Sequence, residues 1–213
     1  MWNTVLFDLD GTLTDSAPGI INSVLCALAH FGIQAEAKDL VKFIGPPLSE
    51  SLPEFYGFDP EQTEKGIHVF REYFEAKGWL ENAPYPGIEE LLRDLKAAGL
   101  RLMVATSKPE KQAVRILEHF RLAQYFDQIC GAPPSTGDGT GKADVIRKAL
   151  AYTGGTDSVI MVGDRRHDVA GAREAGLPCI GVLYGYGDRE ELEQAGAAFI
   201  AEDMAALKAL LLN

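Results

Sequence analysis

Short apolar runs that alternate with amphipathic helical patterns constrain the fold more than any other feature of this sequence. The apolar runs, which we expect to be buried strands, lie at 4–7, 100–105, 158–162, 178–183 and 198–200. Helical periodicity separates or follows them at 88–98, 110–120, 143–152, 169–175 and 204–212. Strands that alternate with helices are typical of a parallel sheet with helices on both faces. The sequence therefore predicts an α/β fold with a doubly wound parallel sheet.

One segment, from 18 to 79, breaks this alternation because its periodicity is helical throughout. Two turn signals interrupt it, Gly45-Pro46-Pro47 and Gly57-Phe58-Asp59-Pro60. We expect an all-helical block inserted after the first strand to form a second, smaller domain. The predicted division is a catalytic α/β core from 1–15 and 82–213, and an inserted helical cap domain from 16–81.

The charge balance limits the kinds of partner that this chain can bind. Its 213 residues include 31 acidic and 20 basic ones, a formal net charge of −11, without a run of lysine or arginine. Such a chain repels nucleic-acid phosphates and anionic membranes, and no stretch approaches the roughly 20 apolar residues of a membrane helix. Three cysteines without C-x-x-C spacing favour reduced core thiols. We expect a cytoplasmic monomer or small homo-oligomer that binds neither nucleic acid nor membranes.

Polar side chains follow three of the expected strands where each strand ends, and a lysine begins a later helix. In an open parallel sheet the carboxyl ends of the strands share one edge, where ligands bind. Several carboxylates at one place repel each other unless a cation lies among them, and oxygen ligands favour a hard ion such as Mg²⁺. Mg²⁺ in turn favours a phosphate substrate. The residues expected to meet at this edge are Asp8, Asp10, Thr12, Thr106, Ser107, Lys142, Asp164 and Asp168.

The spacing of Asp8 and Asp10 indicates covalent chemistry on a phosphate. With one residue between them, both carboxylates leave the strand on a turning backbone and can reach one phosphorus atom. One carboxylate can attack in line, and the other can donate a proton to the leaving oxygen and later accept one from water. Gly11 permits the sharp turn that follows.

These residues occur in motifs that resemble a known family. The segment from Phe7 to Asp15 resembles the first motif of the haloacid dehalogenase superfamily, D-x-D-G-T. Thr106 matches its second motif, a Ser or Thr after a strand, and Lys142 matches the third. The segment from Gly163 to Asp168 matches the fourth, G-D-x-x-x-D. The motifs appear in the family's order over essentially the whole chain, and a helical cap after the first strand is one of the family's arrangements.

The resemblance implies a role for each motif residue. Asp8 would be the nucleophile that forms an aspartyl-phosphate, and Asp10 the general acid and base. Mg²⁺ would be held by the Asp8 carboxylate, the Asp10 backbone carbonyl and Asp164, with Asp168 in support. The residues that would bind the phosphoryl group are Thr106, Ser107 and Lys142.

Other stretches are closest to the phosphoglycolate phosphatases and 5'-nucleotidase-like phosphatases of this superfamily. They are Ile44–Leu48, Tyr85–Gly87, Ala105–Pro109 and Gly181–Gly187. The Gly- and Pro-rich stretch 132–141 lacks the arginine found there in relatives. The resemblance implies a phosphatase for small phosphate monoesters, such as phosphoglycolate or nucleoside monophosphates. Substrate choice would fall to cap residues, for which the candidates are Pro46, Pro47 and Arg71.

Three other activities stay open at the level of the sequence. A phosphomutase or a dehalogenase could use the same fold, although a dehalogenase would need neither a metal nor Asp10 as an acid. A receiver-type signalling domain, which accepts a phosphoryl group, also combines an acid cluster with a hydroxyl and a lysine. The D-x-D spacing and the large helical insertion favour the phosphatase over the signalling domain.

Overall fold

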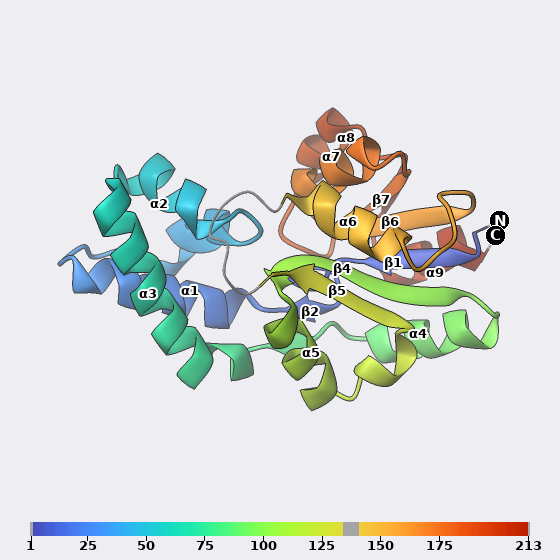
Figure 1. Cartoon of the computed structure of the whole chain (residues 1–213), viewed down its shortest axis with the longest axis horizontal. Coiled ribbons are helices and arrows are strands. Elements are labelled where there is room, and N and C mark those ends of the chain that lie inside the picture. The colour runs from blue at the N-terminus through green and yellow to red at the C-terminus, as the bar shows by residue number, and fades with distance from the viewer. Residues whose placement is uncertain (1, 134–140, 213) are drawn as a thin grey trace. The chain divides into compact units, whose positions relative to one another are not determined.

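A computed structural model of the chain describes residues 2–133 and 141–212 (Figure 1). It contains two compact units, Met1–Thr14 together with Pro84–Asn213, and Asp15–Ala83. We call the first the core unit and the second the helical unit. Most of the Gly- and Pro-rich stretch before Lys142, residues 134–140, lies outside the described residues.

The core unit is built on a six-stranded sheet with the order β5-β4-β1-β6-β7-β8, in which every pairing is parallel. Its strands are β1 (Thr4–Phe7), β4 (Arg101–Pro109), β5 (Gln128–Ala132), β6 (Val159–Gly163), β7 (Cys179–Val182) and β8 (Phe199–Ala201). Its helices are α4 (Ile88–Ala97), α5 (Glu110–His119), η3 (Ala123–Tyr125), α6 (Lys142–Leu150), α7 (Arg166–Glu174), α8 (Arg189–Ala195) and α9 (Met204–Leu212). The predicted α/β fold with a parallel sheet is confirmed.

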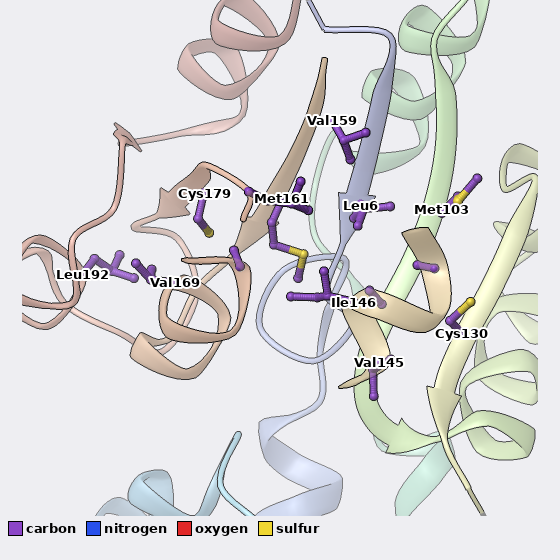
Figure 2. Packing of buried hydrophobic residues seen from close by; sticks show 14 residues of the cluster. Leu6, Met103, Cys130, Val145, Ile146, Val159, Met161, Val169, Cys179 and Leu192 are labelled. Carbon is purple, nitrogen blue, oxygen red and sulfur yellow. The ribbon is translucent and has the colours of Figure 1, made fainter. Parts of the chain in front are cut away.

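Helices cover both faces of this sheet because each central strand is apolar on both sides. Helices α6 and α7 lie on one face, and α4 and α5 lie on the other (Figure 1). Leu6 and Met161 belong to the cluster that packs against Ile146 of α6 (Figure 2). Phe7, which points to the opposite face, makes an edge-to-face contact with Phe126. Two buried layers therefore hold β1 rigidly at the centre of the sheet.

The elements of the core unit that were missed in the sequence include β5, α8 and the single-turn η3. Strand β5 contains Gly131 in a short apolar stretch and, within the part of the chain that the structure describes, pairs with β4 alone, so its pattern is weak. Helix α8 is short and strongly charged, which conceals its periodicity. Its signal was the cap: the Asp188 side chain accepts a hydrogen bond from the Glu191 N–H at 2.8 Å.

The helical unit contains α1 (Ala17–His30), η1 (Ala37–Phe43), α2 (Leu48–Tyr56), α3 (Pro60–Ala76) and η2 (Gly78–Leu80). Helix α3 begins with a capping box in which Asp59 and Gln62 exchange hydrogen bonds at 2.8 and 3.1 Å. Gly57 ends α2 with a positive φ of 67°. Strands β2 (Thr14–Asp15) and β3 (Ala83–Pro84), where the chain leaves and re-enters the core unit, pair with each other.

Two further predictions can be compared with the described residues. Cys130 and Cys179 are free and buried, as expected of core thiols, whereas Cys26 is free and partly exposed. Over residues 2–133 and 141–212, no helix has the length and apolar character that crossing a bilayer requires.

Candidate active site

The candidate site lies at the carboxyl edge of the sheet, around its central strand. The chain runs from β1 to β4 and β5 on one side, and then returns to β6 on the other side of β1. Phe7 is paired with Val104 of β4 and with Val162 of β6, so the residues after these positions meet at one level. Asp8 directly follows β1, and Asp164 directly follows β6. This reversal of strand order is where open parallel sheets bind ligands.

Lys142, the first residue of α6, joins two of the acidic side chains. Its Nζ lies 2.7 Å from Asp8 Oδ1 and 2.7 Å from Asp168 Oδ1, and it donates a hydrogen bond to the Ala105 carbonyl oxygen at 3.1 Å. Burial alone would lower the pKa of Lys142, but the two carboxylates outweigh burial and hold this pKa above its usual value. The site therefore contains a fixed, buried positive charge at neutral pH.

Three carboxylates gather around this charge. One ligand oxygen from each of Asp8, Asp164 and Asp168 lies within 4.8 Å of the other two. Burial raises the pKa of Asp8 to about 6, with Lys142 opposing the rise and Asp168 adding to it. Burial, and then the Asp168 carboxylate, also raise the pKa of Asp164 well above its usual value. Three buried carboxylates face one buried ammonium, so the site has room for a further positive charge such as a divalent cation.

Asp164 is held by neutral donors, which leaves its charge available to a metal. Its Oδ1 accepts a hydrogen bond from the Thr12 hydroxyl at 3.3 Å, and its Oδ2 accepts one from the Tyr186 N–H at 2.8 Å. The loop that carries Tyr186 reaches it because Gly185 has no side chain. A Cβ on Gly185 would overlap the Cβ of Asp164 and the carbonyl oxygen of Gly11.

Asp168 differs from Asp164 because one of its two partners is a charged side chain, the Lys142 ammonium. Oδ1 faces Lys142, and Oδ2 accepts a hydrogen bond from the Arg165 N–H at 3.0 Å at the start of α7. Its carboxylate thereby caps the helix and fixes the lysine at once. One of its oxygens still belongs to the group of three that could hold a metal ion.

The Asp10 carboxylate stands outside this cluster and has a lysine of its own. Its Oδ2 lies 2.8 Å from Nζ of Lys108, and the exposed fractions of the two side chains are 14% and 6%. Lys108 was missed as a site residue. The only signal was its position two residues after Thr106, in a stretch that resembles phosphatases of the branch named above.

The phosphate-binding candidates from β4 lie in an irregular part of that strand. Regular pairing of β4 with β5 breaks between Ala105 and Pro109. Within this break the buried Thr106 accepts a hydrogen bond through Oγ1 from the Lys108 N–H at 3.2 Å, and Ser107 is half-buried. Such a bulge re-aims side chains at a strand end. The expected strand ended at 105, so this bulge was not foreseen.

The three residues predicted to choose the substrate lie in the helical unit. Pro47 precedes α2 and is exposed, and Pro46 is half-buried beside it. Arg71 is exposed on α3. None of these side chains belongs to the cluster described in the core unit.

Comparison with known proteins identifies the family. The model of the haloacid dehalogenase-like hydrolases matches residues 5–182. The chain belongs to this family. The match includes β1, β4, β6 and β7 and every residue of the cluster, so the predicted family is confirmed.

Relatives in this family carry several names. A 5'-nucleotidase from Pseudomonas aeruginosa is 42% identical over 97% of this chain and 94% of its own length. A phosphoglycolate phosphatase from Caulobacter vibrioides is 34% identical over 92% of this chain and 85% of its own. The tyrosine-protein kinase PtkA of Mycobacterium tuberculosis is 43% identical over 92% of this chain and 67% of its own.

A solved structure extends the similarity to three dimensions. The crystal structure of a predicted phosphatase from Clostridium acetobutylicum is 50% identical, with a TM-score of 0.94 over 100% of this chain and 99% of that one. The predicted resemblance to phosphatases of the phosphoglycolate phosphatase and 5'-nucleotidase branch is therefore confirmed.

Proposed function

We propose that this protein is a Mg²⁺-dependent phosphatase that hydrolyses small phosphate monoesters through an aspartyl-phosphate on Asp8. The observation that carries the proposal is the unequal environment of the two carboxylates in the D-x-D motif. Asp8 lies in the acidic cluster with Lys142, whereas Asp10 lies outside it with Lys108. Two carboxylates in different environments suit two different roles, one as nucleophile and one as acid and base.

Asp8 and Asp10 would act in two half-reactions. An oxygen of Asp8 attacks the phosphorus, the bond to the leaving oxygen breaks, and Asp10 donates a proton to that oxygen. Water then attacks the phosphorus of the acyl-phosphate, and Asp10 accepts its proton. Inorganic phosphate leaves, and both carboxylates return to their starting states.

The residues present fit a magnesium ion. Its ligands would be the Asp8 carboxylate, Asp164 and the Asp10 backbone carbonyl, with Asp168 in support through Lys142. An all-oxygen set with buried carboxylates is the kind that Mg²⁺ prefers, and burial, which raises the pKa values of Asp8 and Asp164, makes their charged forms costly without a cation. When bound, the ion would offset the charge of the phosphoryl oxygens.

The phosphoryl group would be bound by residues of β4 and α6. Thr106 and Ser107 provide hydroxyl and backbone donors in the bulge, and helix α5 begins directly afterwards at Glu110. The Lys142 ammonium orients Asp8 and would neutralise charge on the transferred group.

The substrate class follows from relatives rather than from the core unit. The names 5'-nucleotidase and phosphoglycolate phosphatase favour nucleoside monophosphates and small carboxylate-bearing esters. The residues of the core site would contact only the phosphoryl group. We assign selection of the leaving group to the helical unit, where Pro46, Pro47 and Arg71 stay the candidates.

A phosphate-release assay tests the proposal. The purified protein is incubated with Mg²⁺ and p-nitrophenyl phosphate, phosphoglycolate and nucleoside monophosphates, with EDTA and Asp8→Asn as controls. We expect phosphate release from at least one ester that both controls abolish.

The same assay separates the other activities. Phosphoryl migration without release would indicate a mutase, and metal-independent halide release a dehalogenase. A stable phosphoprotein without turnover would indicate a signalling domain. Transfer from ATP to a tyrosine peptide, with every ester inert, would favour the kinase activity named in one relative. Each of these results would overturn the proposal.

A further inference from the structure

Lys108 contacts Asp10 but has no role of its own in the proposed chemistry as described so far. We propose that Lys108 is a positioning residue for Asp10: it binds Oδ2 and thereby presents Oδ1 as the oxygen that exchanges protons with the leaving group and with water. This inference rests on the proposed function. The observation that supports it is the 2.8 Å contact between Lys108 Nζ and Asp10 Oδ2, in which both side chains are largely buried.

The two oxygens of Asp10 have unequal surroundings. Oδ2 faces the Lys108 ammonium, whereas Oδ1 is buried and accepts no hydrogen bond from the described residues. A buried carboxylate oxygen without a donor costs free energy, so such an atom is rare unless a ligand completes it. The leaving oxygen of an ester, and later the attacking water, would supply the missing partner in turn.

A carboxylate in a proton-transfer step gains from being held in one orientation. Rotation about its last side-chain bond exchanges the two oxygens and moves the reactive one away from the leaving group. A short contact to a buried cation suppresses this rotation, and general acid–base catalysis contributes roughly 10²–10⁴-fold only when donor and acceptor are within hydrogen-bond reach. Lys108 would supply that restraint.

The backbone connects this restraint to the phosphate site. Lys108 donates its N–H to Oγ1 of Thr106 at 3.2 Å, inside the bulge of β4. The segment from Thr106 to Lys108 therefore carries both a candidate phosphate ligand, Thr106, and the lysine that binds Asp10. A short, hydrogen-bonded segment fixes the spacing between the two more tightly than separate loops could.

Each carboxylate of the D-x-D motif, Asp8 and Asp10, contacts a different lysine. Lys142 contacts Asp8 and Asp168, and Lys108 contacts Asp10. The loss of Lys142 should disturb attack on every ester. The loss of Lys108 should disturb proton donation, and thus mainly esters whose leaving group needs a proton.

The test uses leaving groups of different basicity. The ratio kcat/KM covers only steps through departure of the leaving group, so it isolates proton donation from hydrolysis of the acyl-phosphate. For Lys108→Met we expect about a 100-fold loss of kcat/KM on an alkyl phosphate such as glycerol phosphate, and less than about tenfold on p-nitrophenyl phosphate, whose leaving group departs without protonation. Lys108→Arg should recover part of the loss, and Lys111→Met, an exposed lysine on α5, should match the wild type.

A double-mutant cycle with Asp10 gives the sharper readout. If Lys108 acts through Asp10, adding Lys108→Met to Asp10→Asn should cost little beyond Asp10→Asn alone. Independent, multiplied losses would overturn the inference, as would an equal loss on both esters. A loss confined to esters with an anionic leaving group would instead make Lys108 a substrate ligand, which also contradicts it.

Control measurements distinguish failure of this inference from misfolding of the variant and from failure of the proposed function. A melting temperature that still rises with Mg²⁺ shows that Lys108→Met is folded with its acidic cluster intact. An inactive wild type would overturn the proposed phosphatase, whereas an active wild type with an unaffected Lys108→Met would overturn this inference alone.

Discussion

The core unit and the helical unit hold their candidate functional side chains in opposite ways. In the core unit Lys142 and Asp168 are buried and bound to each other at 2.7 Å. In the helical unit Arg71 is exposed on α3, and Pro47 is exposed before α2. Side chains fixed by several buried partners suit one unchanging reaction on the phosphoryl group. Exposed side chains can differ between relatives that act on different substrates, because replacing them does not disturb a packed core.

This contrast predicts large effects from core-unit substitutions and small, substrate-dependent ones from the helical unit. The largest is expected for Asp8→Asn, which would remove the proposed nucleophile and a proposed metal ligand together. We expect kcat to fall by at least about three decades on every ester. Steady-state assays with p-nitrophenyl phosphate check this, and a variant that kept a tenth of wild-type turnover would remove Asp8 as the nucleophile.

Lys142→Met should lower both activity and stability. It leaves the buried Asp8 without its cation, and breaking a buried ion pair by removing one partner costs about 3 kcal/mol. The pKa of Asp8, already about 6, should rise further in the variant. A carboxyl with a raised folded-state pKa favours folding at low pH, and loses this contribution as pH rises through that value.

The stability deficit of Lys142→Met should therefore widen between pH 5 and pH 8. Urea unfolding of metal-free wild type and variant at both values measures it, with the exposed Lys111→Met as the matched control. A deficit that stays constant or narrows with rising pH would mean that Lys142 does not compensate the negative charge of Asp8.

Gly185→Ala should have an intermediate effect. The added Cβ would overlap Asp164 and the Gly11 carbonyl, so the loop with Tyr186 must move away from the carboxylate. We expect a loss of about 1–3 kcal/mol in the free energy of unfolding and weaker Mg²⁺ binding by calorimetry. Gly185 is not among the glycines with a positive φ, so this loss would come from the overlap and not from backbone strain. Unchanged Mg²⁺ affinity in Gly185→Ala would mean that the loop with Tyr186 does not position Asp164 for the metal.

How much of this could be predicted from the sequence also differs between residues. The strand ends that carry Asp8 and Asp164 were predictable because apolar runs mark buried strands and turn residues mark where they stop. Strand β5 was missed because an edge strand needs only a weak apolar pattern.

The role of Lys108 was not predictable because a single lysine in a loop carries no periodicity. Its pairing with Asp10 depends on a bulge between Ala105 and Pro109 that only the fold reveals. Contacts between residues far apart in the chain, such as Thr12 with Asp164, are likewise set by the order of the strands.

The smallest effect is expected for Arg71→Ala in the helical unit. An exposed arginine contributes within about 0.5 kcal/mol to stability. If Arg71 pairs with a second anionic group of the substrate, kcat/KM should fall about tenfold for carboxylate-bearing esters alone. A panel of phosphorylated metabolites compared between wild type and variant measures this. Identical profiles would remove Arg71 from substrate choice and favour a phosphatase of broad specificity.

The most direct test of the central claim is to find the phosphoryl group on the protein. Asp10→Asn, which should slow hydrolysis of the acyl-phosphate, is mixed with Mg²⁺ and p-nitrophenyl phosphate, quenched in acid within one turnover, digested and examined by mass spectrometry. We predict a phosphorylated peptide with the modification on Asp8, absent when Asp8→Asn is added. Inorganic phosphate formed at the same rate without any phosphorylated aspartate, or with the label on another residue, would contradict the account.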